Sequence, residues 1–515
     1  MVVPTMTNQP CNTDGSHPAW SERPDAQEFM SLVKAVAQGD TSGLDLSAAE
    51  HAACRGLFSP EDTLHMGRAP GRLDVMGGIA DYSGSLVLQL PLAQGTFAAA
   101  QAPRAPAAGA ATRPLLRIVS LQEDCEGGRD AHPARSTVFE ADLVQLTVSS
   151  YEDAKCQLRS DPATAWAAYV AGGAVVLARE LGVDWARACP GGLRLLLQSS
   201  VPEGKGVSSS AALEVATLSA LLQLLKKSEE RDLCPDLAAL APSDVALLAQ
   251  RVENDVVGAP CGVMDQMASC VGREDSLLVL QCRPARLLPG ASLGSHLSTW
   301  GLDSGVAHCV GGADYGAVRT AAFMGRAIIR RRMQELRLEG EQAGPAAGGF
   351  QDANAWWEAL SLGDRPAKRD DASSSQTLEY LTQLSPSEFE ARWESALPER
   401  MTGAEFIDEF GSHDDPATTI DRDAVYHVRT CTAHPIYENF RVHCFKELLE
   451  TAQQPAPHAW RLLGELMFQS HASYGRCGLG SPGTDRLVEL VREAAALERD
   501  GPVLLGAKIT GGGSG

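Results

Sequence analysis

At 515 residues the chain is longer than one hydrophobic core usually supports, so the length predicts two domains. Its composition, with 44% hydrophobic and 21% charged residues, is that of an ordinary soluble enzyme. A formal net charge of −21 argues against a nucleic-acid partner, because binding to a phosphate backbone requires a basic face.

The cysteines and the apolar stretches indicate in which cellular compartment the protein is expected. The thirteen cysteines are scattered and form no Cys-x-x-Cys pair, which is typical of reduced thiols in the cytosol. Residues 1–15 lack the basic and apolar pattern of a signal peptide. The apolar stretch at 211–225 contains Glu214 and is too short to span a bilayer. We therefore expect a soluble, cytoplasmic protein with no membrane partner.

In chain order, residues 1–59 are expected to form a polar leader that has one short helical patch and no motif. A strand-like, glycine-rich segment follows at 65–92, and Ala/Pro/Gly-rich loops such as 101–114 separate short strand-like runs. Residues 335–376 are rich in Ala, Gly, Asp, Glu and Ser, which predicts a mobile insertion. Strand and helix patterns are interleaved, so the predicted fold class mixes α and β structure.

The strongest local signal is the segment VPEGKGVSSSAA at 201–212, which precedes apolar residues at helical spacing. Gly204 and Gly206 allow the backbone to approach a ligand closely, and the free N–H groups of the following helix favour an anion. A plain serine-capped core helix explains the segment about equally well when it is taken alone. The segment is not a Walker A motif, because Lys205 is not followed by Ser or Thr.

Two acidic residues follow, one on the next predicted helix, whose apolar positions run from 245 to 256, and one after it. Ser243 is its expected N-cap, and Gly258 is expected to end it. Glu253 lies near the end of this helix and Asp265 follows a Gly-Ala-Pro-Cys-Gly bend, so one carboxylate could hold Mg²⁺ while the other accepts a proton. Two solvated surface acids are the alternative, and the apolar, glycine-bracketed setting of Asp265 argues against it.

Two further segments have alternative interpretations. Residues 506–515, GAKITGGGSG, are either a ligand-binding loop or a flexible tail, and the preceding apolar run at 503–505 favours the loop. Five side chains within eighteen residues suggest a zinc site, although their spacing fits no familiar ligand pattern. These residues are His427, Cys431, His434, His443 and Cys444.

Three glycine segments in this order resemble those of the GHMP kinases. They are Ala69–Gly84 (APGRLDVMGGIADYSG), Pro202–Ala212 and Gly506–Gly515, with PCGVMDQ between the second and the third. PCGVMDQ, HCVGGADYGAVR and GELMFQSHASY are similar to segments of the galactokinase branch, and GAPCGVMDQ, HPIYENFRV and GAKITGGGSG are similar to the plant L-arabinokinases. The resemblance covers residues 50–335 and 376–515.

The resemblance implies a role for each matching residue. Asp265 would be the catalytic carboxylate that activates the sugar hydroxyl, and Arg72 beside it would stabilise charge on the transferring phosphoryl group. Ser210 and Glu253 would hold Mg²⁺, and Asp81 and Tyr315 would contact sugar hydroxyls. The residues that would surround ATP are Pro202, Gly204, Lys205, Gly206, Val207, Ser208, Ser209, Ser210 and Ala211, together with Gly511, Gly512 and Gly513, which would also help to close the active site.

The sequence departs from galactokinases at Gly78 and Ile79, where they carry Glu-His. That polar pair helps to hold the rim of the hexose, including its hydroxymethyl group, which L-arabinopyranose lacks. Buried polar groups left unpaired cost about 1–3 kcal/mol each. Gly78 and Ile79 therefore predict a preference for L-arabinose over D-galactose.

The resemblance implies an ATP-dependent sugar 1-kinase that uses Mg²⁺ and converts L-arabinose to L-arabinose 1-phosphate. The alternatives are a galactokinase and a non-catalytic regulator that binds sugar and ATP. The expected fold is α+β, with a ribosomal-protein-like α/β domain at 60–300, a ferredoxin-like α/β domain at 301–515 and the active site between them. GHMP kinases continue past the third glycine segment with a helix and strands, so we expect a truncated C-terminal end.

Overall fold

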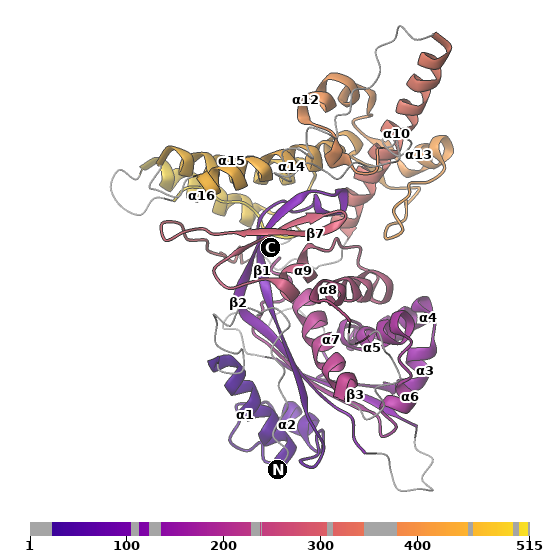
Figure 1. The fold of residues 1–515 in the computed structure, drawn as a ribbon, viewed down its shortest axis with the longest axis vertical. Helices are drawn as coiled ribbons and strands as arrows, with labels where there is room; N and C mark the ends of the chain where they lie inside the picture. The colour runs from indigo at the N-terminus through magenta and orange to yellow at the C-terminus, as the bar shows by residue number, and fades with distance from the viewer. Residues whose placement is uncertain are drawn as a thin grey trace. The chain divides into compact units, whose positions relative to one another are not determined.

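The computed structural model describes residues 23–104, 113–122, 135–227, 237, 239–305, 313–343, 378–451, 457–497 and 504–512. The chain divides into two compact units, each made of several stretches of sequence (Figure 1). Unit 1 comprises 1–73, 90–203 and 207–274, and unit 2 comprises 74–89, 204–206 and 275–515. Two long strands, β1 (His65–Met76) and β2 (Leu86–Gln101), each begin in one unit and end in the other.

A β-sheet forms the centre of unit 1. Its strands in this unit follow the order β4-β3-β5-β2, where β3 is Leu115–Gln122, β4 is Val138–Asp142 and β5 is Leu193–Ser199. Strand β5 runs parallel to β3, with Ile118 opposite Leu195, and antiparallel to β2, with Ala98 opposite Leu197. The apolar run of β5 is almost entirely buried, as expected for a central strand with both faces covered.

Helices α5, α7, α8 and α9 of unit 1 pack against one another (Figure 1). Helix α7 begins at Ser209, within the second glycine segment, and α9 carries Asp265 in its first turn. The helices of unit 1 are α1 (Pro24–Gln38), α2 (Ala48–Cys54), α3 (Leu143–Val148), α4 (Tyr151–Arg159), η3 (Ala165–Ala167), α5 (Ala168–Leu181), α6 (Trp185–Ala188), α7 (Ser209–Lys227), α8 (Pro242–Arg251), η6 (Val252–Val257) and α9 (Met264–Val271).

The prediction of a separate leader at 1–59 is wrong for its described part, residues 23–59. Helices α1 and α2 pack into the core of unit 1, where the Phe29 ring stacks on Phe97 of β2 with 5.0 Å between ring centroids. Phe29, Leu32, Val33 and Val36 recur at helical spacing and are all buried, so they form one apolar face against the sheet. Residues 1–22 lie outside the described part of the chain.

Unit 2 combines the other end of the sheet with a group of helices. Its strands follow the order β2-β6-β7, and α10 and α15 both pack on α14 (Figure 1). The elements of unit 2 are η2 (Asp81–Ser83), β6 (Leu277–Cys282), β7 (Ala285–Ala291), α10 (Ala313–Ala343), η7 (Leu381–Gln383), α12 (Pro386–Glu388), η8 (Phe389–Trp393), η9 (Glu394–Ala396), β8 (Met401–Thr402), α13 (Gly403–Phe410), β9 (Val425–Tyr426), α14 (Val428–Thr451), α15 (Pro457–Arg476) and α16 (Pro482–Leu497).

The structure differs from the predicted boundary at residue 300 and from the expected ferredoxin-like domain. The boundary follows residue 274, because β6 pairs with residues 86–89 of β2 and so belongs to unit 2. In the described part of 301–515 the strands are β8 and β9, of two residues each, and the rest is mainly helical. A ferredoxin-like sheet is therefore not seen there. Of the predicted insertion at 335–376, residues up to Ala343 continue α10, and 344–376 lie outside the described residues.

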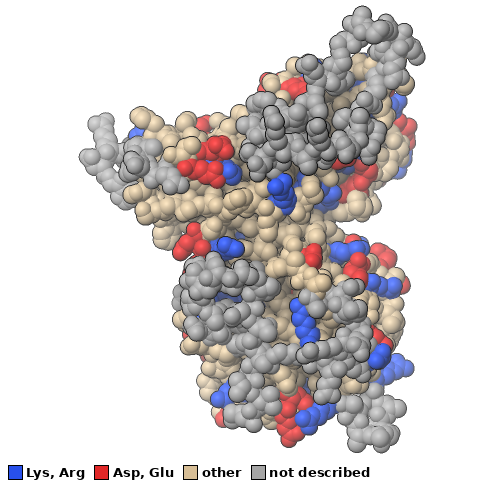
Figure 2. All heavy atoms as spheres, in the orientation of Figure 1, with Lys and Arg blue, Asp and Glu red and all other residues tan. Residues whose placement is uncertain are grey.

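Two surface properties bear on the expected partners. Among the described helices, none has the length and apolar character needed to cross a membrane. On the face drawn in Figure 2, the described lysines and arginines lie singly or beside acidic side chains, without a continuous basic patch.

Candidate active site

Arg72 and Asp265, the predicted catalytic pair, form an ion pair within unit 1. Arg72 donates from Nη2 to Asp265 Oδ1 at 2.6 Å and from Nε to the same oxygen at 3.0 Å. The carboxylate lies in the first turn of α9, where the helix dipole favours a negative charge. The Arg72 side chain is 2% exposed and that of Asp265 is 23% exposed. A fixed guanidinium thus holds a carboxylate that still reaches solvent, as a general base must.

Glu253, the predicted metal ligand, lies on the π-helical segment η6 that continues α8. Gly258 ends this helix in a left-handed conformation with φ of 77°, as predicted. The prediction that Ser243 is the N-cap is wrong, because the helix already begins at Pro242. The N-cap position is therefore Ala241, and the Asp244 carboxylate accepts a hydrogen bond from the Ala241 N–H at 2.8 Å. This backbone donor at the start of the helix thus has a partner other than Ser243.

Gln266, which the sequence analysis did not assign, connects Glu253 to a second buried acid, Glu214. Its Nε2 donates to Glu253 Oε2 at 2.7 Å and to Glu214 Oε2 at 3.2 Å. Glu214 and Gln266 are fully buried, and Glu253 is 8% exposed. Because Gln266 directly follows Asp265, the same turn of α9 places the candidate base and orients the candidate metal ligand. Its position next to Asp265 in the PCGVMDQ segment was the available sequence signal.

The two acids differ from solvated carboxylates in their titration. Burial, and next the negative charge of Asp265, raise the pKa of the Glu253 carboxyl to about 7, although hydrogen bonds from Ser210, Cys261 and Gln266 act in the opposite direction. Burial, together with the charge of Glu253, raises the pKa of Glu214 well above its usual range. A cation beside Glu253 would therefore favour its ionised form and would be bound more tightly as the pH rises.

We expect the Glu253→Gln variant to change how stability depends on pH in metal-free buffer. The folded wild type holds the Glu253 proton up to about pH 7, whereas the unfolded chain releases it near the ordinary pKa of 4.5. Stability from this group is therefore fully present below pH 4.5 and declines as the pH rises to about 7, by on the order of 3 kcal/mol. Urea unfolding at several pH values should show a smaller decline in Glu253→Gln. Exposed Glu61→Gln, in the same unit, is the matched control, and parallel curves for wild type and Glu253→Gln would contradict the assignment.

The second glycine segment has the backbone expected of an anion-binding turn. Gly204 and Gly206 both have φ of 69°, Ser208 has φ of 59°, and α7 begins at Ser209. The Ser208 hydroxyl is buried and has no hydrogen-bond partner among the described residues. A phosphate oxygen is one group that this hydroxyl and the first N–H groups of α7 could bind. Lys205 forms an ion pair with Asp303, with 2.9 Å between Nζ and Oδ1.

Contacts within each unit connect the three glycine segments in pairs. In unit 1 the Arg72 N–H donates to the Val207 carbonyl at 3.1 Å, which joins the first segment to the second. In unit 2 a Cβ added at Gly206 would lie 2.8 Å from the Thr510 carbonyl oxygen, so glycine permits a close approach of the second segment to the third. The Asp74 N–H donates to Thr510 Oγ1 at 2.9 Å, which joins the first segment to the third.

A buried ion pair fixes the third segment to the first. Lys508 Nζ lies 2.7 Å from Asp74 Oδ2 and donates to the Asp74 carbonyl at 3.1 Å, and the two side chains are 2% and 0% exposed. Gln89 Nε2 donates to Asp74 Oδ1 at 2.8 Å. The Tyr474 hydroxyl lies 3.1 Å from the Gly511 carbonyl and 3.4 Å from Asp74 Oδ2. Sequence reasoning did not assign Asp74 or Lys508, although each is a charged residue inside a glycine segment.

The glycines of the third segment are only partly described. Gly511 has φ of 63°, which favours glycine, and a Cβ added at Gly512 would lie 3.7 Å from Cδ2 of Tyr315. The structure thus brings the predicted nucleotide-binding Gly512 next to the predicted sugar-binding Tyr315. Gly513 lies outside the described residues.

Asp81 and Tyr315, the predicted sugar contacts, lie near the same buried arginine in unit 2. Asp81 begins the short helix η2, and Tyr315 in α10 packs edge-on against Tyr82 with 6.0 Å between ring centroids. Arg319, one turn beyond Tyr315, interacts electrostatically with both Tyr315 and Asp81. Its guanidinium binds Asp415 through two hydrogen bonds of 2.8 and 2.7 Å, and both side chains are buried. The Arg319–Asp415 pair therefore fixes the arginine beside the candidate sugar contacts.

Gly78 and Ile79 form a constrained turn. Ile79 has φ of 51°, an unusual conformation for a β-branched residue, and is fully buried in the apolar core of unit 2. The turn is held by His434 of α14, whose Nε2 lies 3.1 Å from the Gly78 carbonyl oxygen. Burial lowers the pKa of His434 to about 4, so the ring is neutral at neutral pH. Since a carbonyl only accepts, Nε2 carries the proton and Nδ1 accepts from the Ser473 hydroxyl at 2.8 Å.

A second side chain of α14 fixes the preceding residue of this turn. Glu438 is fully buried and accepts a hydrogen bond from the Gly77 N–H at 3.1 Å. It also accepts from Arg441 Nε and from the Ser470 hydroxyl, both at 2.7 Å. Although burial opposes ionisation, the charge of Arg441 lowers the pKa of Glu438 to about 2, so the carboxylate is ionised at neutral pH. His434 and Glu438, four residues apart on one helix face, together stabilise the strained turn.

The structure does not favour the zinc site suggested by the histidines and cysteines in and near α14. Among the described residues, no group of three or more His, Cys, Asp or Glu side chains is placed to hold a metal ion.

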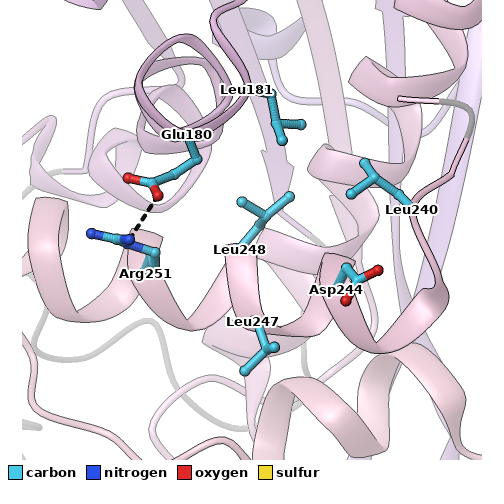
Figure 3. Close-up of a pocket in the computed structure, with 7 residues that line it drawn as sticks. All are labelled: Glu180, Leu181, Leu240, Asp244, Leu247, Leu248 and Arg251. Carbon is cyan, nitrogen blue, oxygen red and sulfur yellow. Dashed lines mark hydrogen bonds and ion pairs between the residues drawn. The ribbon is translucent and has the colours of Figure 1, made fainter. Parts of the chain in front are cut away.

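A pocket in unit 1 lies apart from the predicted site residues. This open pocket of about 290 Å³ is lined by Leu181, Leu240, Leu247, Leu248, Asp244 and the Glu180–Arg251 ion pair (Figure 3). None of the predicted site residues lines this pocket.

Comparison with known proteins shows two family matches. Residues 168–273 match the GHMP kinases N terminal domain, and residues 55–102 match the galactokinase galactose-binding signature. The first match contains Ser208–Ser210, Glu253 and Asp265, and the second contains Arg72 and Asp81.

Curated relatives extend the similarity over most of the chain. L-arabinokinase of Arabidopsis thaliana is 42% identical over 506 residues, which cover 94% of this chain and 45% of that protein. Galactokinase of Canis lupus familiaris is 30% identical over 305 residues, which cover 58% of this chain and 65% of that protein. The chain thus spans about half of the L-arabinokinase and less than two thirds of the galactokinase.

A crystal structure of Lactococcus lactis galactokinase complexed with galactose shares the fold. It aligns with a TM-score of 0.55 at 18% sequence identity and covers 95% of this chain and 88% of the galactokinase chain. The two domain matches, the similarity to L-arabinokinase and galactokinase, and the shared α+β fold all agree with the arrangement of the glycine segments. The chain belongs to the GHMP kinase family, on its galactokinase branch.

Proposed function

We propose that this chain is an ATP-dependent sugar 1-kinase that phosphorylates L-arabinose. The oxygen of the anomeric hydroxyl attacks the γ-phosphorus, the bond between that phosphorus and the β,γ-bridging oxygen breaks, and ADP leaves. The hydroxyl proton passes to the Asp265 carboxylate. The Arg72–Asp265 ion pair is the observation that carries the proposal, because it combines a partly exposed base with a fixed positive charge.

The second glycine segment supports ATP as the phosphoryl donor. Members of the GHMP kinase family use ATP, and the left-handed turn at 204–208 followed by the N-terminus of α7 suits its phosphates. Glu253 and Ser210 offer the hard oxygen ligands that Mg²⁺ prefers, and a hydrogen bond already joins them. Bound there, Mg²⁺ would neutralise charge on the transferring phosphoryl group. We assign the other predicted contacts, from Pro202 to Ala211 and from Gly511 to Gly513, to nucleotide binding on the same basis.

The proposed sugar specificity depends on the turn at 77–79 and on two polar residues of unit 2. Asp81 and Tyr315 are proposed to contact sugar hydroxyls, with Arg319 and Asp415 as positioning residues behind them. Gly78 adds no polar group that would need the hydroxymethyl of a hexose. The similarity to an L-arabinokinase over 94% of the chain supports the same substrate.

The test is release of ADP in the presence of Mg-ATP and one sugar at a time, with L-arabinose, D-galactose, D-glucuronate and L-fucose. We expect turnover chiefly with L-arabinose. Turnover chiefly with D-galactose would instead identify a galactokinase. Binding of sugar and ATP without release of ADP would identify a non-catalytic regulator, and calorimetry with the non-hydrolysable ATP analogue AMP-PNP distinguishes this outcome from loss of the fold.

A further inference from the structure

We infer that Tyr474 is a specificity-determining residue, because its side chain occupies the space that a side chain at position 78 would need. The inference rests on the proposed function, since it concerns the choice between a pentose and a hexose. The inference gives α15, which is far in sequence from the first glycine segment, a direct influence on the turn at 77–79.

The geometry within unit 2 leaves no room at Gly78. A Cβ added there would lie closer than 3.0 Å to both the Tyr474 hydroxyl oxygen and Asp74 Oδ2, a separation that real Cβ atoms essentially never show. The Gly78 backbone does not itself require glycine, because its φ lies outside the left-handed region. The requirement for glycine is therefore steric, and Tyr474 and Asp74 impose it.

Neither obstacle is free to move. Tyr474 is fully buried, and its ring packs edge-on against the His434 ring with 5.3 Å between centroids. Lys508 Nζ lies 5.3 Å from the centroid of the same ring. The Asp74 carboxylate is held by Lys508 at 2.7 Å and by Gln89 at 2.8 Å. A side chain introduced at 78 would have to displace at least one of these buried groups.

The steric conflict at Gly78 limits how this turn could acquire the polar side chains that contact a hexose in galactokinases. Galactokinases carry Glu-His where this chain has Gly78 and Ile79, but Gly78→Glu alone would collide with Tyr474. Ile79 is part of the apolar core, so Ile79→His would bury an imidazole among apolar groups. A larger polar side chain at 78 therefore requires a shorter residue at 474 first. Tyr474→Leu removes the nearer of the two obstructing oxygens and keeps the position apolar, so that only the Asp74 carboxylate has to shift.

A stability cycle tests the steric part without any activity measurement. We expect Gly78→Ala to lower the thermal midpoint by several degrees in the wild type and by clearly less in the Tyr474→Leu background. Gly475→Ala is the matched control, because a Cβ at this neighbouring position meets no atom within 4 Å. Equal shifts for Gly78→Ala in both backgrounds would overturn the inference, since independent sites are additive.

Sugar kinetics test the specificity part. We expect Gly78→Glu/Tyr474→Leu to raise the ratio of kcat/KM for D-galactose to that for L-arabinose at least tenfold above Tyr474→Leu alone. An unchanged ratio in this double variant would overturn the role in specificity. Absence of turnover by the wild type with every sugar would count against the proposed function instead, and the stability cycle would still decide whether Tyr474 excludes a side chain at 78.

Discussion

Asp265→Asn should reduce kcat with L-arabinose by about 10²–10⁴-fold while the fold is retained, because an amide cannot accept the proton of the sugar hydroxyl. The amide oxygen can still accept hydrogen bonds from the buried guanidinium of Arg72, so the thermal midpoint should fall less than in a variant that removes the acceptor altogether. Steady-state ADP release and circular dichroism of the same preparation would measure both effects.

A second substitution at the same position separates the chemical role from the structural one. Asp265→Ala should lose the same activity and should also lower the thermal midpoint, because it removes the carboxylate that pairs with the buried guanidinium. Asp255→Asn is the matched control, since Asp255 pairs with Arg251 at 3.0 Å on the surface of the same unit. Near-normal kcat in Asp265→Asn would refute the role of Asp265 as the base.

Lys508→Met should destabilise the protein by about 3–5 kcal/mol, because it leaves the Asp74 carboxylate buried without its cation. The third glycine segment would lose its attachment to the first, so kcat should also fall at temperatures where the variant is still folded. Urea unfolding and ADP release would measure the two effects.

The double variant Asp74→Asn/Lys508→Met provides the informative comparison for this pair. It removes both charges together, so we expect it to recover much of the stability lost in Lys508→Met. Lys446→Met is the matched control, because Lys446 pairs with Glu450 at 2.8 Å along the more exposed side of α14, where such pairs contribute about 0.3–0.5 kcal/mol. A loss in Lys508→Met no larger than in this control would show that the pair does not hold the segment in place.

Local sequence patterns predicted several features of the site correctly. The helix that follows the glycines of the second segment begins at Ser209, and Gly258 ends the helix that carries Glu253. These features depend on residues within one or two turns of each other, such as a glycine with positive φ or an apolar face at helical spacing. The pairing of Arg72 with Asp265 came only from the resemblance to the GHMP kinases, since the two residues are 193 positions apart.

Other local predictions failed where packing had the larger effect. The described part of the leader folds as α1 and α2 because the apolar face of α1 is covered by Phe97 and other residues of the sheet. The division expected at residue 300 is not the observed one, since strand pairing assigns β6 to unit 2. Both failures arise because burial against distant residues stabilises an element more than its own composition suggests.

The sequence by itself determined the glycine segments, the helices that follow them and the acids that they present, because each depends on neighbours in the chain. The tertiary structure alone decided which buried groups hold these parts in place. Asp74 meets Lys508 across 434 residues, and His434 meets the Gly78 carbonyl across 356. It also decided that Tyr474 fills the space beside Gly78. A buried charge or hydroxyl needs a hydrogen-bond partner, and the folded chain can supply that partner from any position in the sequence. No local pattern of residues specifies which position this is.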